Sequence, residues 1–171
     1  MEEAGIRTVI DLTDDAEEAR AYDMLPGPDG EGLRIFARTF LMDAAQEEFR
    51  TDLAAALRFL IANDGPYLVH CLEGKDRTGF VCALLECLAG ASLDEACEDY
   101  MKTYENFYRV QRDSTQYAHI RTGNLEAILR RAFAVEDPAS ADLAACARVY
   151  LVSGGMTDAE IDALTARLAG K

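Results

Sequence analysis

A short and mostly apolar strand, a turn that contains a glycine and an almost wholly apolar helix follow one another between Tyr67 and Gly90. The strand reads YLVH, the turn CLEGK, and the helix TGFVCALLECLAG after Asp76-Arg77. A helix that is apolar on nearly every side belongs in the centre of a core, and a strand of this composition belongs in a buried sheet. This segment therefore predicts an α/β fold built around the strand at 67–70.

The rest of the chain continues the alternation. We expect strands at 7–12 and 33–40, helices at 14–22 and 44–62, and a loop rich in Pro and Gly at 25–32. Capping boxes at Ser92/Glu95 and Thr157/Glu160 begin two later helices, with one or two more helices between them. Strands that alternate with helices predict a parallel sheet covered on both faces. With no repeat and no linker, residues 1–171 are expected to form a single α/β domain with a helical C-terminal half.

The amino-acid composition argues against two classes of binding partner, nucleic acids and membranes. The formal charge of -14 repels nucleic acid and anionic lipid, so we expect neither nucleic-acid binding nor stable membrane association. No apolar run approaches the roughly 20 residues that a membrane span needs. The N-terminus, Met1-Glu2-Glu3-Ala4, has neither the basic start nor the apolar stretch of a signal peptide. A cytoplasmic location is the resulting expectation.

The cysteines point to reduced thiols. There are five, an odd number, and no pair has the Cys-x-x-Cys spacing of a zinc or redox site. Four of them, Cys82, Cys87, Cys97 and Cys146, stand among apolar neighbours and are predicted to pack as small hydrophobic residues. Cys71 differs, because it directly follows a strand.

The segment from Cys71 to Thr78, which we call the Cys71 loop, has the composition of an anion site. The unpaired N–H groups of a tight loop and of a helix's first turn can surround a phosphate. Five residues separate Cys71 from Arg77, so a loop wrapped round a phosphate brings thiol and guanidinium to the same centre. The helix N-terminus, Lys75 and Arg77 are expected to lower the pKa of the thiol and make it nucleophilic. The predicted phosphate-binding residues are Leu72, Glu73, Gly74, Lys75, Asp76 and Arg77, with Thr78 donating a hydrogen bond to the sulfur.

The string HCLEGKDRTG resembles the active-site loop of the protein tyrosine phosphatase superfamily. Its GKDRTG ending is similar to an atypical bacterial and fungal branch of tyrosine and phosphoinositide phosphatases, and GIRTVIDL and GMTDAEIDAL also resemble that branch. The resemblance implies the cysteine-phosphatase fold, a phosphocysteine intermediate, no metal and no cofactor. The substrates that it implies are phosphotyrosine or phosphorylated inositols.

Two carboxylic acids compete for the role of proton donor to the leaving group. Asp76 lies in the loop, and the matching aspartate of the branch is thought to be its general acid. Asp43 follows the second strand, 28 residues before Cys71, where better-known members of the superfamily keep a mobile acid loop. Its alternative is a helix N-cap. Asp11 matches an aspartate that approaches the catalytic arginine, so the resemblance implies that it orients Arg77.

Two features depart from that branch. A small residue is common where Glu73 stands, and a carboxylate there is expected to favour cationic or less charged substrates. The branch also usually has an additional N-terminal segment, which this sequence lacks before Met1. The expected activity is hydrolysis of phosphotyrosine in proteins or of a small phosphorylated substrate. The alternatives are an inositol phosphate or phosphoinositide phosphatase and a phosphate-binding module without catalysis.

A local excess of positive charge lies between Lys102 and Arg131, in contrast to the acidic chain as a whole. We hypothesise that Arg109, Arg112 or Arg121 lies near the pocket mouth and guides phosphorylated substrates; a solvated helix face is the alternative. Three aromatic residues of the same region, Tyr104, Phe107 and Tyr108, either wall the pocket or pack in the core.

Overall fold

The fold is known from a computed structural model, which describes residues 4–14, 17 and 32–170. Three parallel strands, β1 (Thr8–Asp11), β2 (Arg34–Ala37) and β3 (Tyr67–His70), form a small sheet in the order β2-β1-β3. In this register Asp11 lies beside both His70 and Ala37, so all three strands end at one edge. The α/β fold with a small parallel sheet is confirmed.

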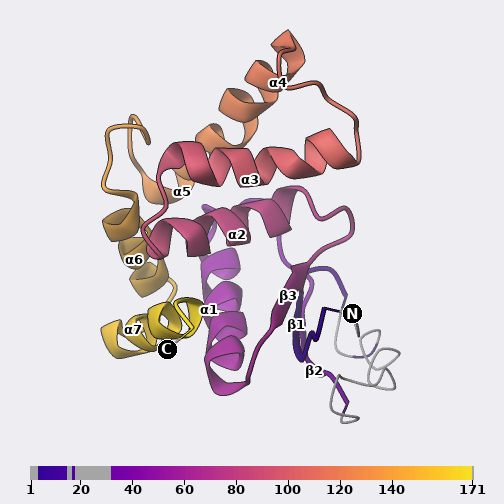
Figure 1. Cartoon of the computed structure of the whole chain (residues 1–171). Helices are drawn as coiled ribbons and strands as arrows, with labels where there is room; N and C mark the ends of the chain where they lie inside the picture. The colour runs from indigo at the N-terminus through magenta and orange to yellow at the C-terminus, as the bar shows by residue number, and fades with distance from the viewer. Residues whose placement is uncertain (1–3, 15–16, 18–31, 171) are drawn as a thin grey trace.

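Two long helices pack against this sheet. Helix α1 (Glu47–Ala62) buries Phe49, Leu53 and Leu57, and α2 (Asp76–Leu88) buries Phe80 and Leu84. All of these side chains belong to one continuous hydrophobic cluster that also contains Ile10 of β1. In the part of the chain that the structure describes, the helices lie to one side of the sheet (Figure 1).

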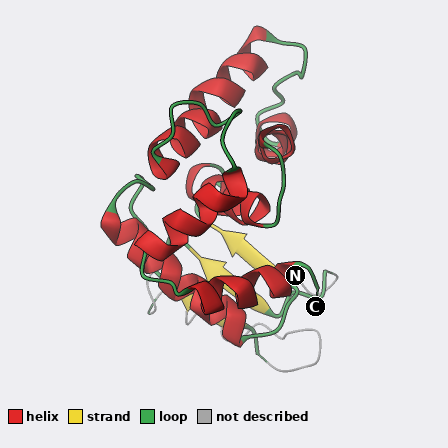
Figure 2. Ribbon diagram, turned by 90° about the vertical axis from the view of Figure 1, so that its left-hand side faces the viewer, coloured by secondary structure: helices red, strands yellow, loops and turns green. Residues whose placement is uncertain are grey.

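The C-terminal half is helical. It contains α3 (Leu93–Asn106), α4 (Thr115–Ile120), the π-helix η2 (Arg121–Glu126), α5 (Ala127–Phe133), α6 (Leu143–Ser153) and α7 (Asp158–Leu168). Both predicted capping boxes are present, Ser92 with Glu95 at α3 and Thr157 with Glu160 at α7. Figure 2 shows these helices above and in front of the sheet. None of the described helices is long and apolar enough to cross a bilayer.

Helices α2 and α3 approach each other closely at Gly79. A Cβ atom at this position would lie 2.5 Å from the ring of Tyr100, closer than two carbon atoms pack. The glycine of the Arg-Thr-Gly sequence therefore lets α3 lie over the start of α2. This contact places the C-terminal end of α3, with Tyr104 and Tyr108, beside the Cys71 loop.

Several predicted boundaries shift. The strand at 33–40 is shorter, Arg34–Ala37, although the N–H groups of Arg38 and Phe40 still bond to β1 and to the residue after it. Helix α1 begins at Glu47 instead of Ala44, because residues 44–46 form a separate turn closed by the bond from Gln46 N to Asp43 O. Four helices and a π-helix follow α3, more than the two or three expected. The predicted helix at 14–22 and loop at 25–32 lie almost entirely outside the described residues.

Candidate active site

The Cys71 loop leaves the sheet at the carboxyl edge and ends in the first turn of α2. Gly74 has a φ of +64°, a backbone conformation that glycine adopts without a steric penalty. Lys75 is the N-cap of α2, and its side chain makes no capping hydrogen bond. The side chain of the cap residue therefore does not occupy the first N–H groups of α2. An anion can bind at a helix N-terminus only when these N–H groups are free in this way.

The thiol of Cys71 is half-buried at the centre of this loop. Burial by itself raises its pKa, but hydrogen bonds from the Thr78 hydroxyl and from the N–H groups of Thr78, Glu73 and Gly74 outweigh burial and lower the pKa below its ordinary value. These donors, which include the Thr78 N–H in the first turn of α2, give the largest lowering contributions, ahead of Lys75 and Arg77. The Thr78 hydroxyl is among the groups that lower the pKa of the thiol, yet it is buried and forms no hydrogen bond of ordinary geometry among the described residues, so it is available to the Cys71 sulfur.

Arg77 is held in place by main-chain carbonyl groups. Its Nη1 donates to the carbonyl oxygens of Leu12 at 2.9 Å and Phe40 at 3.4 Å. Leu12 follows β1 and Phe40 lies three residues beyond β2, so both neighbouring strand ends fix the guanidinium. Its other nitrogens meet no acceptor among the described residues, which leaves them able to bind two phosphate oxygens.

Among the described residues no hydrogen bond or ion pair joins the carboxylate of Asp11 to Arg77, and the role in orienting Arg77 that the resemblance implies stays a prediction. Asp11 is fully buried, and its Oδ1 accepts the N–H groups of Thr13 at 2.9 Å and Asp14 at 3.2 Å. Its Oδ2 lies 3.7 Å from Nε2 of His70, at the end of the adjacent strand. Asp11 thus shapes the turn that presents the Leu12 carbonyl to Arg77.

The two candidate acids lie in different surroundings. Asp76 lines a pocket of about 290 Å³ together with Met42, Cys71, Leu72, Glu73, Lys75 and Arg77. Asp43 does not line it. The Oδ1 atom of Asp43 accepts the N–H of Ala45 at 3.1 Å and lies 3.7 Å from Arg131, so Asp43 caps the turn before α1. This arrangement favours Asp76 as the proton donor.

Comparison with known proteins agrees with this geometry. The model described as "Tyrosine phosphatase family" matches residues 1–170. The chain belongs to the tyrosine phosphatase family. It is also 43% identical over 47 residues to the "Triple specificity protein phosphatase PtpB" of Mycobacterium tuberculosis, a match that covers 28% of this chain and 17% of that protein.

The other thiols of this tyrosine phosphatase family member differ from Cys71. Cys82, Cys87 and Cys97 lie in α2 and α3, and burial raises the pKa of each to about 11. Cys82 lines a small cavity of about 90 Å³ behind the loop, beside Thr78 and Glu86. All five cysteines are free thiols in the structure. Compared with Cys82, Cys87 and Cys97, Cys71 is the thiol whose pKa is lowered, because its hydrogen-bond donors overcome the effect of burial.

The arginines proposed to guide substrate do not line the pocket. Arg112 pairs with Glu105 at 2.8 Å, and Arg121 pairs with Asp94 and Glu126. Arg109 is exposed and forms no ion pair with a described residue. Of the three aromatic residues, Tyr104 is buried in the core, whereas Tyr108 reaches the loop and donates a hydrogen bond to Glu73.

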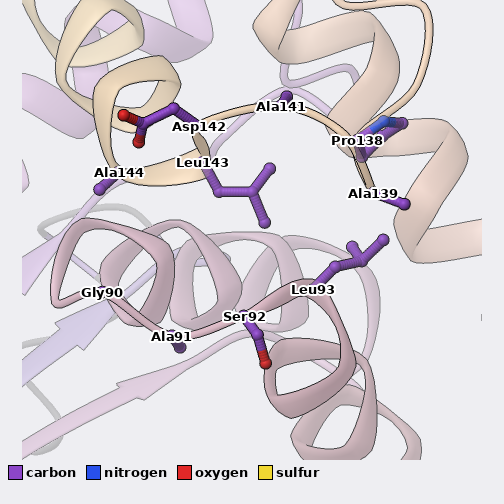
Figure 3. Close-up of a pocket in the computed structure, with 10 residues that line it drawn as sticks. All are labelled: Gly90, Ala91, Ser92, Leu93, Pro138, Ala139, Ala141, Asp142, Leu143 and Ala144. Atoms are coloured by element: carbon purple, nitrogen blue, oxygen red, sulfur yellow. The ribbon is translucent and has the colours of Figure 1, made fainter.

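A second pocket of about 300 Å³ lies away from the thiol, between residues 90–93 and 138–144. Leu93 and Leu143 project into it, whereas the carboxylate of Asp142 points to the start of α6 (Figure 3). Asp142 there accepts the N–H of Ala145 at 3.0 Å. Apart from Ser92 and Asp142, whose side chains cap helices, the side chains that line this pocket are apolar.

Three contributors to the active-site pocket escaped the sequence analysis: the carbonyl groups of Leu12 and Phe40, and the side chain of Met42. All three follow β1 or β2 at the carboxyl edge of the sheet. Parallel strands bring their carboxyl ends together at one edge of the sheet. The position of these three residues just after a predicted strand could therefore have indicated that they lie near the pocket.

Proposed function

We propose that this protein is a cysteine-dependent phosphatase that hydrolyses phosphate monoesters, with phosphotyrosine in proteins as its preferred substrate. The observation that carries the proposal is the convergence of Cys71, Arg77 and Asp76 on one pocket, where nearby hydrogen-bond donors also lower the pKa of the thiol. A thiolate, a fixed guanidinium and a carboxylic acid are the three groups that phosphoryl transfer through cysteine needs.

In the first step the Cys71 sulfur attacks phosphorus while the bond from phosphorus to the leaving oxygen breaks. Asp76 gives its proton to that oxygen, so the alcohol or phenol leaves neutral. Arg77 and the loop N–H groups bind the remaining phosphate oxygens as charge redistributes over them. Asp11 contributes from a distance, through the turn whose Leu12 carbonyl holds Arg77.

In the second step a water molecule attacks the phosphocysteine, and the Asp76 carboxylate accepts one of its protons. The phosphorus–sulfur bond breaks, inorganic phosphate leaves, and the electron pair returns to Cys71 as thiolate. The Thr78 hydroxyl, buried beside the sulfur, stabilises this returning charge. Asp76 ends protonated and Cys71 ionised, as they began.

Phosphotyrosine is preferred because the pocket has an apolar rim. Leu72 is 80% exposed and Met42 is 64% exposed, and both line the pocket. Such side chains offer contact to an aromatic ring but no hydrogen bond to the hydroxyls of an inositol. Lys75 is the feature that favours the second candidate, an inositol phosphate, because its ammonium lies in the same pocket.

The test is vanadate-sensitive hydrolysis of para-nitrophenyl phosphate and of a phosphotyrosine peptide. We expect turnover by the parent protein and a loss of about 10³-fold or more for Cys71→Ser. The control Cys82→Ser changes a thiol outside the pocket and is expected to stay close to the parent. A rapidly quenched reaction should show phosphate on Cys71 by peptide mass spectrometry. Tight vanadate binding without turnover would instead support the phosphate-binding module.

A further inference from the structure

Glu73 and Tyr108 enclose the ammonium group of Lys75 at the rim of the pocket. The Nζ atom of Lys75 lies 3.1 Å from Oε2 of Glu73, and the same Oε2 accepts a hydrogen bond from the Tyr108 hydroxyl at 3.0 Å. Nζ also lies 5.5 Å from the centre of the Tyr108 ring, within the range of a cation–π contact. These three side chains, which we call the rim cluster, come from the loop and from the residues after α3.

The ammonium of Lys75 is paired most closely with Glu73. Besides Glu73, the Oδ2 atom of Asp76 lies 3.7 Å from its Nζ. The side chain of Lys75 is 23% exposed and that of Glu73 is 54% exposed, so the carboxylate, not the ammonium, is the more accessible charge of the pair. An anion that approaches the rim therefore meets a negative group first.

The loop as a whole then has one cation free for phosphate. Glu73 offsets Lys75, and Asp76, the proposed proton donor, carries its proton when substrate binds, so Arg77 is the cation left for phosphate. A single phosphate at the sulfur binds Arg77 and the loop N–H groups. A second phosphate on the neighbouring atom of the substrate would lie near the rim, where Glu73 repels it and competes with it for Lys75.

We propose that Glu73 is a specificity-determining residue, which selects singly phosphorylated substrates by holding Lys75 and repelling a second, adjacent phosphate. The inference rests on the proposed phosphatase function and deepens it, since it states which phosphate esters the site rejects. It also removes the main argument for an inositol polyphosphate as substrate, because the lysine that would bind the additional phosphate is already paired.

The test compares the parent with Glu73→Gln, which keeps the shape of the side chain and removes its charge. The substrates are a singly phosphorylated tyrosine peptide and a soluble inositol bisphosphate with phosphates on adjacent carbons. We expect the ratio of kcat/KM for the bisphosphate to kcat/KM for the peptide to rise about tenfold, mainly through KM. Glu105→Gln, which changes an ion-paired carboxylate outside the pocket, should leave the ratio at the parent value. An unchanged ratio in Glu73→Gln would overturn the inference.

The same comparison is made for binding, so that it does not depend on turnover. In a Cys71→Ser background, adding Glu73→Gln should strengthen binding of the inositol bisphosphate about tenfold relative to phosphotyrosine, as measured by calorimetry. The gain should shrink as salt is raised, because it comes from charge. If the parent turns nothing over but this binding ratio rises, the phosphatase proposal fails and the role of Glu73 stands. If turnover occurs and neither ratio changes, the role of Glu73 fails alone.

Discussion

The pocket at the Cys71 loop and the pocket between residues 90–93 and 138–144 have nearly equal volumes, about 290 and 300 Å³. They differ in how the fold uses their polar groups. In the second pocket, Ser92 and Asp142 already cap α3 and α6, and the remaining lining is mostly Ala, Gly and Leu. Their hydrogen-bonding capacity is used for helix ends.

At the Cys71 loop the polar groups are held in place but not used up. The N-cap of α2 has no side-chain cap, the Thr78 hydroxyl has no oxygen or nitrogen partner among the described residues, and Arg77 uses one nitrogen for two carbonyl groups. Positioned polar groups without internal partners are costly to a fold unless they serve a ligand. Positioned polar groups without internal partners, more than volume, therefore distinguish the candidate active site from the second pocket.

After Cys71→Ser, the substitution that should lower kcat/KM most is that of the proposed proton donor, Asp76. Asp76→Asn should lower kcat/KM for phenyl phosphate by about 10²–10⁴-fold, because the phenolate then leaves without a proton. The loss should be smaller for para-nitrophenyl phosphate, whose leaving group is stable as an anion. Asp43→Asn is the matched control and should have a small effect, since Asp43 lies outside the pocket lining. Steady-state kinetics on both substrates measure these effects. A larger loss of kcat/KM in Asp43→Asn than in Asp76→Asn would assign the role of proton donor to Asp43.

Thr78→Val tests whether the unused hydroxyl serves the sulfur. Removing this donor takes away a contribution that lowers the pKa of Cys71, so the pKa rises and less thiolate is present at a given pH. The acid limb of the pH–rate profile should move to higher pH, and kcat/KM at low pH should fall about tenfold. The rate of Cys71 alkylation by iodoacetamide against pH, with Cys71→Ser as blank, reports the same shift.

Thr103→Val is the control for this experiment. Its hydroxyl also lies near the loop and donates to the Gly74 carbonyl at 3.4 Å, but it does not contribute to the pKa of the thiol. Its alkylation profile should match that of the parent. Equal shifts in the two variants would mean that the loop responds to any nearby loss of a hydroxyl, and that Thr78 has no special role.

The sequence predicted those secondary-structure elements whose ends are marked by particular side chains. The strand at 67–70 was located to the residue, since Pro66 precedes it and Cys71 begins the loop, and both capping boxes were present as expected. The start of α1 was misplaced because Asp43 caps a separate turn. Glu47 and Glu48, favourable in the first turn of a helix, were the better signal for its beginning.

The candidate site was predicted only in part, for a physical reason. The loop residues are consecutive, so their convergence followed from the sequence. What orients Arg77 could not be predicted, because the acceptors are main-chain carbonyl groups of Leu12 and Phe40, which every residue has. The rim cluster joins Glu73 to Tyr108, 35 residues apart, through the packing of α3 on α2, and no local pattern encodes that packing.

Ser92→Ala should have the smallest effect of these substitutions, and it tests the second pocket. The Ser92 hydroxyl caps α3, so its removal should lower the free energy of unfolding by about 1 kcal/mol. Because the second pocket has no part in the proposed chemistry, kcat/KM should not change. Urea denaturation and para-nitrophenyl phosphate kinetics measure the two quantities, with the exposed Ser140→Ala as a control expected to stay within about 0.5 kcal/mol. A loss of activity at unchanged stability would instead link the second pocket to the Cys71 loop through α2, and the two pockets would no longer be independent.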